Sequence, residues 1–62
     1  MANKGKADFL RVYSNLSEDL RGEIIMIVNN GPYTWKSAYL EVEKDTALGK
    51  QILEKAIELG LI

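Results

Sequence analysis

Apolar side chains recur every three or four residues near the amino terminus. Phe9, Tyr13 and Leu16 lie at positions i, i+4 and i+7, which is the spacing of one face of an α-helix. We therefore predict a short amphipathic helix from Lys6 to Tyr13, with a break that begins at Ser14.

The second half of the chain carries two longer stripes with the same period. The apolar positions are Trp35, Ala38, Tyr39 and Val42 in the first stripe and Leu48, Ile52, Ala56 and Leu59 in the second. Thr34 and Asp45 precede these stripes and have side chains that commonly cap the first turn of a helix. Gly60 is typical of a helix end. These signals predict helices over residues 34–44 and 45–60.

The segment between these regions has two interpretations. Ser17 resembles an N-cap followed by two acidic residues, apolar residues then recur at helical spacing up to Val28, and Gly31 and Pro32 follow as stop signals. Five consecutive apolar residues followed by Asn-Gly are also typical of a buried strand that enters a hairpin. We favour a helix, which gives a mainly α, four-helix domain; the alternative is an α+β domain with a hairpin at residues 23–35.

The length allows a single domain over residues 1–62, of which we expect 1–5 to be flexible. A chain of 62 residues is close to the lower limit for independent folding. Its 47% hydrophobic and 27% charged residues are typical of a folded domain. No cysteine or histidine is present to form a disulfide or a zinc cluster, so we expect packing, aided by self-association, to supply the stability.

The apolar run from Ile24 to Val28 is the longest in the chain. It is far shorter than the roughly 18 residues that a membrane span requires. Asp8 and Arg11 interrupt the amino-terminal segment before the apolar region of a secretion signal develops. We therefore expect no membrane association, and the absence of cysteine suits a cytoplasmic location.

The side-chain chemistry required for catalysis is sparse. There is no histidine to act as a base and no cysteine to act as a nucleophile. Glu41 and Glu43 would point to different sides of a helix because they are two residues apart. The acidic groupings also lack the ligand pattern and turn glycine of a calcium loop. We expect no enzymatic activity, no metal and no cofactor.

Residues 20–62 resemble the helix-turn-helix core of winged-helix proteins. The matching positions are the turn Asn30-Gly31-Pro32-Tyr33-Thr34, the inward-facing Ala38 and Tyr39, the polar cap Asp45 and the ending Leu59-Gly60-Leu61-Ile62. In this family a first helix ends in the turn, a positioning helix follows it, and a recognition helix follows the second cap. The resemblance therefore implies a small DNA-binding or regulatory protein.

The resemblance also implies which side chains would contact DNA. Outward-facing residues of the last helix would enter the major groove, and residues of the preceding helix and turn would contact phosphate. The first group is Thr46, Ala47, Lys50, Gln51 and Lys55, and the second is Lys36, Ser37 and Lys44. Lys4, Lys6 and Arg11 would add a basic arm.

Two departures from the family pattern predict modest, salt-dependent affinity for DNA. The chain stops at Ile62, where the family continues into a hairpin wing. Its formal net charge is −1, whereas neutralisation of phosphates supplies much of the affinity of DNA-binding domains. The alternative interpretation of the same lysines is a solvated helix surface with ion pairs between neighbouring turns.

The competing hypothesis is a protein-interaction or self-assembly module that does not bind nucleic acid. The charge is near neutral, and the core is too small to hide Phe9, Trp35, Tyr39 and Leu61 together. An exposed apolar patch would then bind a second copy or another protein. Tyr33, Trp35 and Tyr39 could instead stack on single-stranded bases, although their spacing favours a place in the core.

Overall fold

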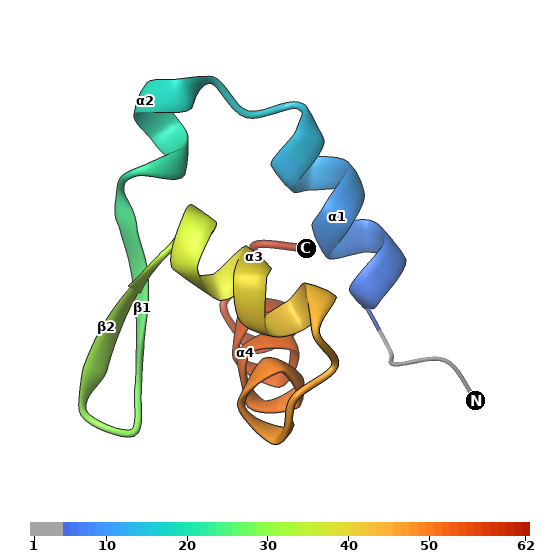
Figure 1. Ribbon diagram of the computed structural model, residues 1–62, viewed down its shortest axis with the longest axis vertical. Coiled ribbons are helices and arrows are strands. Elements are labelled where there is room, and N and C mark those ends of the chain that lie inside the picture. The colour runs from blue at the N-terminus through green and yellow to red at the C-terminus, as the bar shows by residue number, and fades with distance from the viewer. Residues whose placement is uncertain (1–4) are drawn as a thin grey trace.

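The computed structural model describes residues 5–62. Within this range the chain forms four helices and one two-stranded antiparallel sheet (Figure 1). The elements in chain order are α1 (Lys6–Ser14), α2 (Glu18–Arg21), β1 (Ile24–Val28), β2 (Gly31–Thr34), α3 (Trp35–Glu43) and α4 (Ala47–Glu58). The expected flexibility of residues 1–5 falls almost entirely on 1–4, which lie outside the described residues.

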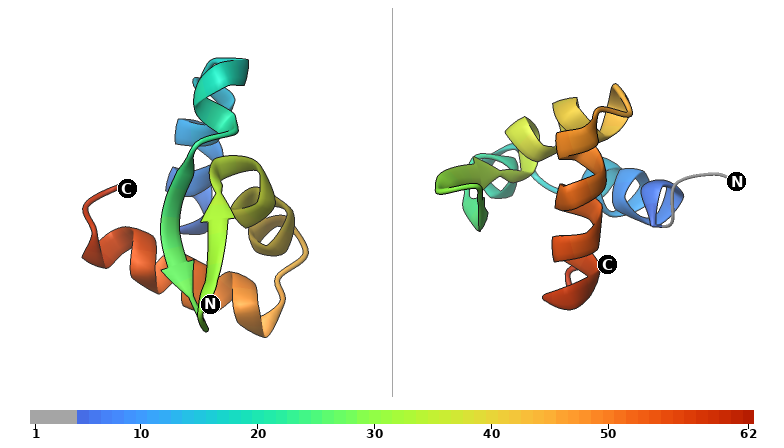
Figure 2. Two further views of the ribbon diagram at one scale, coloured as in Figure 1. Left: turned by 90° about the vertical axis from the view of Figure 1, so that its left-hand side faces the viewer. Right: turned by 90° about the horizontal axis from the view of Figure 1, so that it is seen from below.

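Helix α3 lies between the other elements. It contacts α1 on one side and α4 on another, while the hairpin contacts α3 through β2 and α4 through β1 (Figures 1 and 2). The buried side chains that these elements share are Phe9, Met26, Val28, Trp35, Ala38, Val42, Ile52, Leu53 and Ala56. The rings of Phe9 and Trp35 lie 5.3 Å apart at the centre of this core.

The amino-terminal predictions are confirmed. The first helix spans Lys6–Ser14, one residue beyond its predicted end, and it buries Phe9 completely. The hydroxyl of Ser17 accepts a hydrogen bond from the amide of Leu20 at 3.3 Å, which caps α2. These features depend on local patterns, which is why the sequence predicted them.

The helix favoured over residues 17–28 is wrong beyond Arg21. Helix α2 has four residues, and the chain then enters β1. In β1 alternate side chains face opposite sides, so Met26 and Val28 enter the core while Ile27 faces outward. The β-branched residues of this segment favour a strand, and the hairpin supplies the pairing partner. The domain is therefore helical with an added β-hairpin, close to the alternative interpretation.

A two-residue turn connects the strands. Asn29 and Asn30 have φ angles of 53° and 67°, which fit the type I′ turn that joins tightly twisted strands. Val28 pairs with Gly31 and Ile27 pairs with Pro32. Gly31 and Pro32 thus belong to β2 and do not end a helix as predicted.

The predicted cap of α3 is confirmed. The hydroxyl of Thr34 accepts a hydrogen bond from the amide of Ser37 at 3.0 Å, and the hydroxyl of Ser37 accepts one from the amide of Thr34 at 2.9 Å. Two main-chain amides that the helix leaves unpaired are satisfied by this reciprocal arrangement. It fixes the point at which β2 ends and α3 begins.

The predicted role of Asp45 as the cap of α4 is wrong. Thr46 caps α4, and its hydroxyl accepts a hydrogen bond from the amide of Gly49 at 2.9 Å. Asp45 has a φ of 57°, and main-chain bonds from Asp45 to Val42 and from Thr46 to Glu41 close the end of α3. This is a Schellman motif, in which the residue after the C-cap adopts a left-handed conformation.

Helix α4 ends with the same motif, as the glycine predicted. Gly60 has a φ of 78°, and the amide of Leu61 donates to the carbonyl of Ala56 at 2.8 Å. The helix itself ends at Glu58, two residues before the predicted boundary. A left-handed residue therefore ends both α3 and α4, but only α4 uses the glycine that makes such an end recognisable in a sequence.

Candidate interaction surface

The residues predicted to contact DNA lie on α3, α4 and the turn between them. Lys36, Lys44, Ala47, Lys50 and Gln51 are exposed, whereas Ser37, Thr46 and Lys55 are half-buried. They therefore do not form one uniformly accessible face. The segment that the winged-helix resemblance assigns to a helix before the turn is β1 in this fold.

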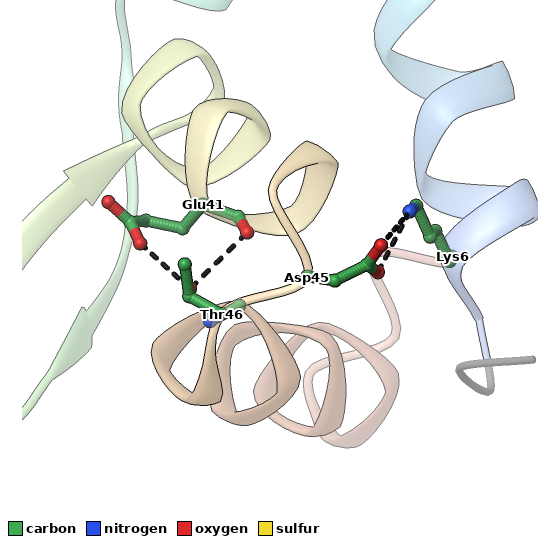
Figure 3. Close-up of polar contacts among 5 residues, drawn as sticks. Lys6, Glu41, Asp45 and Thr46 are labelled. Atoms are coloured by element: carbon green, nitrogen blue, oxygen red, sulfur yellow. Dashed lines mark hydrogen bonds and ion pairs between the residues drawn. The ribbon is translucent and has the colours of Figure 1, made fainter.

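The hydroxyls of the half-buried Ser37 and Thr46 already have hydrogen-bond partners within the protein. Ser37 belongs to the capping box of α3. Thr46 caps α4 and also donates to the carboxylate of Glu41 at 2.8 Å (Figure 3). These contacts fix the ends of the helices and place an acidic side chain beside the start of α4.

The remaining polar residues on α4 are partly paired. The side-chain amide of Asn29 donates to the side-chain oxygen of Gln51 at 3.1 Å, which ties the hairpin turn to α4. Lys55 forms an ion pair with Glu58 at 3.3 Å. The exposed Glu54 lies between Gln51 and Lys55 in sequence. The charge on this surface is consequently mixed.

Two cations of the predicted basic arm have acidic partners. Lys6 forms an ion pair with Asp45 at 2.8 Å, linking α1 to the turn before α4 (Figure 3). Arg11 forms an ion pair with Asp8 at 2.6 Å. Lys4 lies outside the described residues. The described part of the arm therefore presents paired charges.

The aromatic side chains are engaged in packing. Trp35 is only 8% exposed. The ring of Tyr39 stacks on Tyr13 at 4.2 Å, and the guanidinium of Arg21 lies over Tyr13 at 4.4 Å. A hydrogen bond from the Tyr39 hydroxyl to Glu43, together with the carboxylate charge, raises the pKa of Tyr39 above its ordinary value. These contacts build a layered cluster of Arg21, Tyr13 and Tyr39 on the protein itself.

The apolar patch named in the interaction hypothesis is not the one that the fold exposes. Phe9 is completely buried and Trp35 nearly so, while Tyr39 and Leu61 are half-buried. The predicted composition of the patch is therefore wrong for Phe9 and Trp35. Phe9 of α1 and Trp35 of α3 meet in the core, as the helical spacing of Trp35 had favoured.

The hairpin instead presents an apolar outer face. Ile24 and Ile27 are 66% and 64% exposed, and Pro32, the cross-strand partner of Ile27, is exposed beside it. Leu59, at the end of α4, is 50% exposed although its spacing predicted a buried position. We call Ile24, Ile27, Pro32 and Leu59 the hairpin patch.

An open groove runs between β1 and the carboxyl-terminal part of α4. Its lining residues are Ile24, Ile25, Met26, Ile27, Lys55 and Leu59. In Figure 2 (left), α4 crosses behind the hairpin and its carboxyl-terminal end emerges beyond β1. The groove adjoins the hairpin patch, so strand and helix form one continuous apolar surface with a single lysine in it.

Sequence reasoning missed Ile24 and Ile27 as surface residues, yet a signal was present. A five-residue apolar strand must direct some of its side chains away from the side that packs on the core. A strand with Met26 and Val28 in the core therefore predicts an exposed Ile27, and the bulge between Ile24 and Met26 turns Ile24 to the same face.

Two other features were sought in the described residues, a metal site and a membrane-spanning helix. Between residues 5 and 62, no group of three or more acidic, cysteine or histidine side chains is arranged to hold a metal ion. No helix in that part of the chain is sufficiently long and apolar to cross a membrane. Comparisons with protein-family models, curated proteins and solved structures find no match to this chain.

Proposed function

We propose that this protein is an interaction module that binds another protein chain through the hairpin patch and the adjoining groove. The observation that carries the proposal is the exposure of Ile24 and Ile27 on one face of a two-stranded sheet. Exposed apolar side chains are common singly, but a contiguous group beside a groove is typical of a binding surface.

The energy available from this patch is limited. Complete burial of an isoleucine or leucine side chain contributes about 1.5–3 kcal/mol, so covering the exposed parts of Ile24, Ile27 and Leu59 contributes roughly 3–5 kcal/mol. Association also costs several kcal/mol of lost translational and rotational freedom. Apolar burial by these three side chains therefore supports only weak binding, and a tighter partner must make further contacts.

Photo-crosslinking in the cells that make the protein tests the proposal. A benzophenone side chain is placed at Ile24 within the hairpin patch and, as a matched control, at the exposed Ala7 of α1. We expect protein adducts from position 24 and few from position 7, because α1 lies on the opposite side of α3 from the hairpin (Figure 1). Equal crosslinking from both positions, or none from position 24, would contradict the proposal.

DNA binding through α3 and α4 is a second candidate function. It is favoured by Lys36, Lys44 and Lys50, which are exposed and, among the described residues, form no ion pair. Glu41 and Glu54 on the same two helices weaken the positive potential that phosphate binding requires.

Titration of labelled duplex DNA at low and moderate salt tests this second function. The expected result is weak binding that declines with salt and is lost when Lys50 and Gln51 are both replaced by alanine. Replacement of the exposed Glu18 and Asp19 on α2 by alanine is the control. If no binding occurs even at low salt, DNA is not the ligand.

A further inference from the structure

We propose that the partner at this surface is a second copy of the chain, joined by antiparallel pairing of the outer edges of the two β1 strands. This inference rests on the proposed function, since it assigns the occupant of the same surface. The two hairpins would form a four-stranded sheet around a twofold axis close to Ile27. Such self-complementary contacts are the usual basis of homodimers.

The alternation of hydrogen bonds in the hairpin leaves main-chain groups free at Ile27. Val28 and Gly31 close a two-residue turn and form a hydrogen-bonded pair. The next pair, Ile27 and Pro32, is then a non-hydrogen-bonded pair whose main-chain groups face away from the hairpin. Over residues 5–62, no hydrogen bond joins β1 to any element other than β2. The amide and carbonyl of Ile27 are therefore available to another strand.

The opposite edge of the hairpin is closed. At the corresponding position, β2 has Pro32, which has no amide hydrogen to donate. Proline on an edge strand is a common means of preventing further pairing. Strand β2 also lies beside α3 (Figure 2, left). A second chain can thus extend the sheet at β1 but not at β2.

The sequence of the open edge suits pairing with itself. No charged residue occurs from Ile24 to Asn30, so antiparallel strands centred on Ile27 bring no like charges together. Charged side chains are the usual protection of an edge strand, and here they are absent. The bulge between Ile24 and Met26 limits the regular edge to the part around Ile27, so the added pairing is short.

Helix α4 adds contacts beneath the extended sheet. Lys55 and Leu59 line the groove, and Glu58 lies one turn from Lys55. A twofold axis near Ile27 would place the two copies of α4 in opposite directions on the same side of the extended sheet. Leu59 supplies apolar surface at the same place. The groove therefore adds apolar surface beside the open edge of β1.

The surface area that the dimer can bury indicates how strongly the two copies associate. The accessible surface of the chain is 4139 Å², and a stable interface buries about 800 Å² on each partner, roughly a fifth of that surface. A short edge, two isoleucines and the end of α4 cover less than this. We therefore expect a reversible dimer that forms as concentration rises.

Sedimentation velocity over a concentration series, together with amide hydrogen exchange, tests the inference. We expect a shift from monomer to dimer, and at least a tenfold weaker association for Ile27→Lys. The control is Leu40→Lys, which makes the same change of charge at another exposed apolar residue, 44% exposed on α3, and should leave association unchanged. Circular dichroism establishes that both variants are folded.

Amide exchange of the unmodified chain identifies the edge without any variant. The Ile27 amide should exchange rapidly when dilute and slowly when concentrated, whereas the Met26 amide, which pairs with Tyr33 in the hairpin, should be protected in both states. Association with an Ile27 amide that remains rapid would overturn the edge pairing. A strict monomer at millimolar concentration would overturn the dimer.

The same crosslinking experiment separates the two proposals. Adducts from position 24 that contain only a second copy agree with both proposals. Adducts that contain only other proteins retain the interaction module and overturn self-pairing. Absence of any adduct from position 24 contradicts the proposed function itself.

Discussion

The α3–α4 helix pair and the β1–β2 hairpin are both built from two elements joined by a tight turn, with positive φ at Asp45 in the first and at Asn29 and Asn30 in the second. They differ in how completely their apolar residues are covered. The helix pair buries Trp35, Ala38 and Val42 from α3 and Ile52, Leu53 and Ala56 from α4. The hairpin buries Met26 and Val28 but leaves Ile24 and Ile27 largely exposed.

This difference follows from geometry and the small size of the core. A helix can collect its apolar residues on one stripe, so a single neighbour covers them. A strand divides its side chains between two faces, and here helices cover only one. The helix pair therefore contributes more side chains to the core, and the hairpin carries the two most exposed large apolar side chains, Ile24 and Ile27.

The largest expected effect comes from truncating a core residue of the helix pair. Ile52 is completely buried, and Ile52→Ala should lower the free energy of unfolding by about 2–5 kcal/mol, because it removes buried groups and leaves a cavity. The matched change on the hairpin, Ile27→Thr, should alter it by no more than about 0.5 kcal/mol. Urea denaturation at dilute protein measures both. Equal losses of free energy of unfolding in the two variants would mean that the helix pair and the hairpin stabilise the fold to the same extent.

A smaller effect is expected where α3 and α4 approach most closely. A Cβ atom at Gly49 would lie 2.4 Å from the carbonyl oxygen of Glu41. Gly49→Ala should therefore destabilise the fold by about 1–3 kcal/mol through overpacking, even though alanine favours helices by about 1 kcal/mol.

Gly22→Ala is the control for this substitution. Its Cβ would meet nothing closer than 3.7 Å, so the change should be neutral or stabilising by about 0.4–1 kcal/mol. Thermal denaturation of both variants makes the comparison. A stabilised Gly49→Ala variant would show that the helices can separate without cost.

The turn of the hairpin should respond to conformational strain. Asn30 has a φ of 67°, which glycine adopts freely and alanine adopts at a cost of about 1 kcal/mol. We expect Asn30→Ala to destabilise the fold by about that amount and Asn30→Gly to be neutral or slightly stabilising. Amide exchange of Val28 and Met26 reports whether the loss is confined to the hairpin. An equal loss of stability with Asn30→Ala and Asn30→Gly would show that the positive φ of Asn30 is not the cause.

The smallest expected effect concerns the exposed side of α3. The hydrogen bond from Tyr39 to Glu43 at 3.2 Å, and then the charge of Glu43, raise the pKa of Tyr39. A raised pKa in the folded state contributes stability below the unfolded value of about 10, and this contribution is lost as pH rises through the folded pKa.

Glu43→Gln should return the pKa of Tyr39 toward its ordinary value, as followed by tyrosinate absorbance. Comparison with the Tyr39→Phe variant identifies which of the tyrosines has the raised pKa. Replacement of the exposed Glu54 on α4 by glutamine should leave the titration unchanged. If Glu43→Gln leaves the pKa of Tyr39 unchanged, Glu43 is not the cause of the raised pKa.

Much of the fold could be predicted because its signals are local. Ser17 and Thr34 cap their helices, and Gly60 ends α4, each through contacts within four or five residues. Asp45 was misassigned because aspartate is both a good cap and one of the few residues other than glycine that tolerate positive φ. Its neighbour Thr46 could cap equally well, so the choice depended on how α3 ended.

The candidate surface was less predictable than the fold. The polar positions on and beside α4 could be identified by residue type, but the pairing of Gln51, Thr46 and Lys55 depends on distances in the folded chain. Their partners are Asn29, Glu41 and Glu58. The hairpin patch could not be assigned while residues 24–28 were taken as helical. One wrong element therefore hid Ile24 and Ile27 as surface residues.

The sequence by itself determined the caps at Ser17 and Thr34 and the left-handed Gly60 that ends α4, because these contacts involve only neighbouring residues. It left residues 24–28 open to a helix or a strand, because five consecutive apolar residues suit both. Only the tertiary structure decided that this segment is a strand, that Phe9 and Trp35 share the core, and that the edge at Ile27 stays open. Those outcomes depend on contacts between distant residues, whose free energies exceed the local preferences of any one segment.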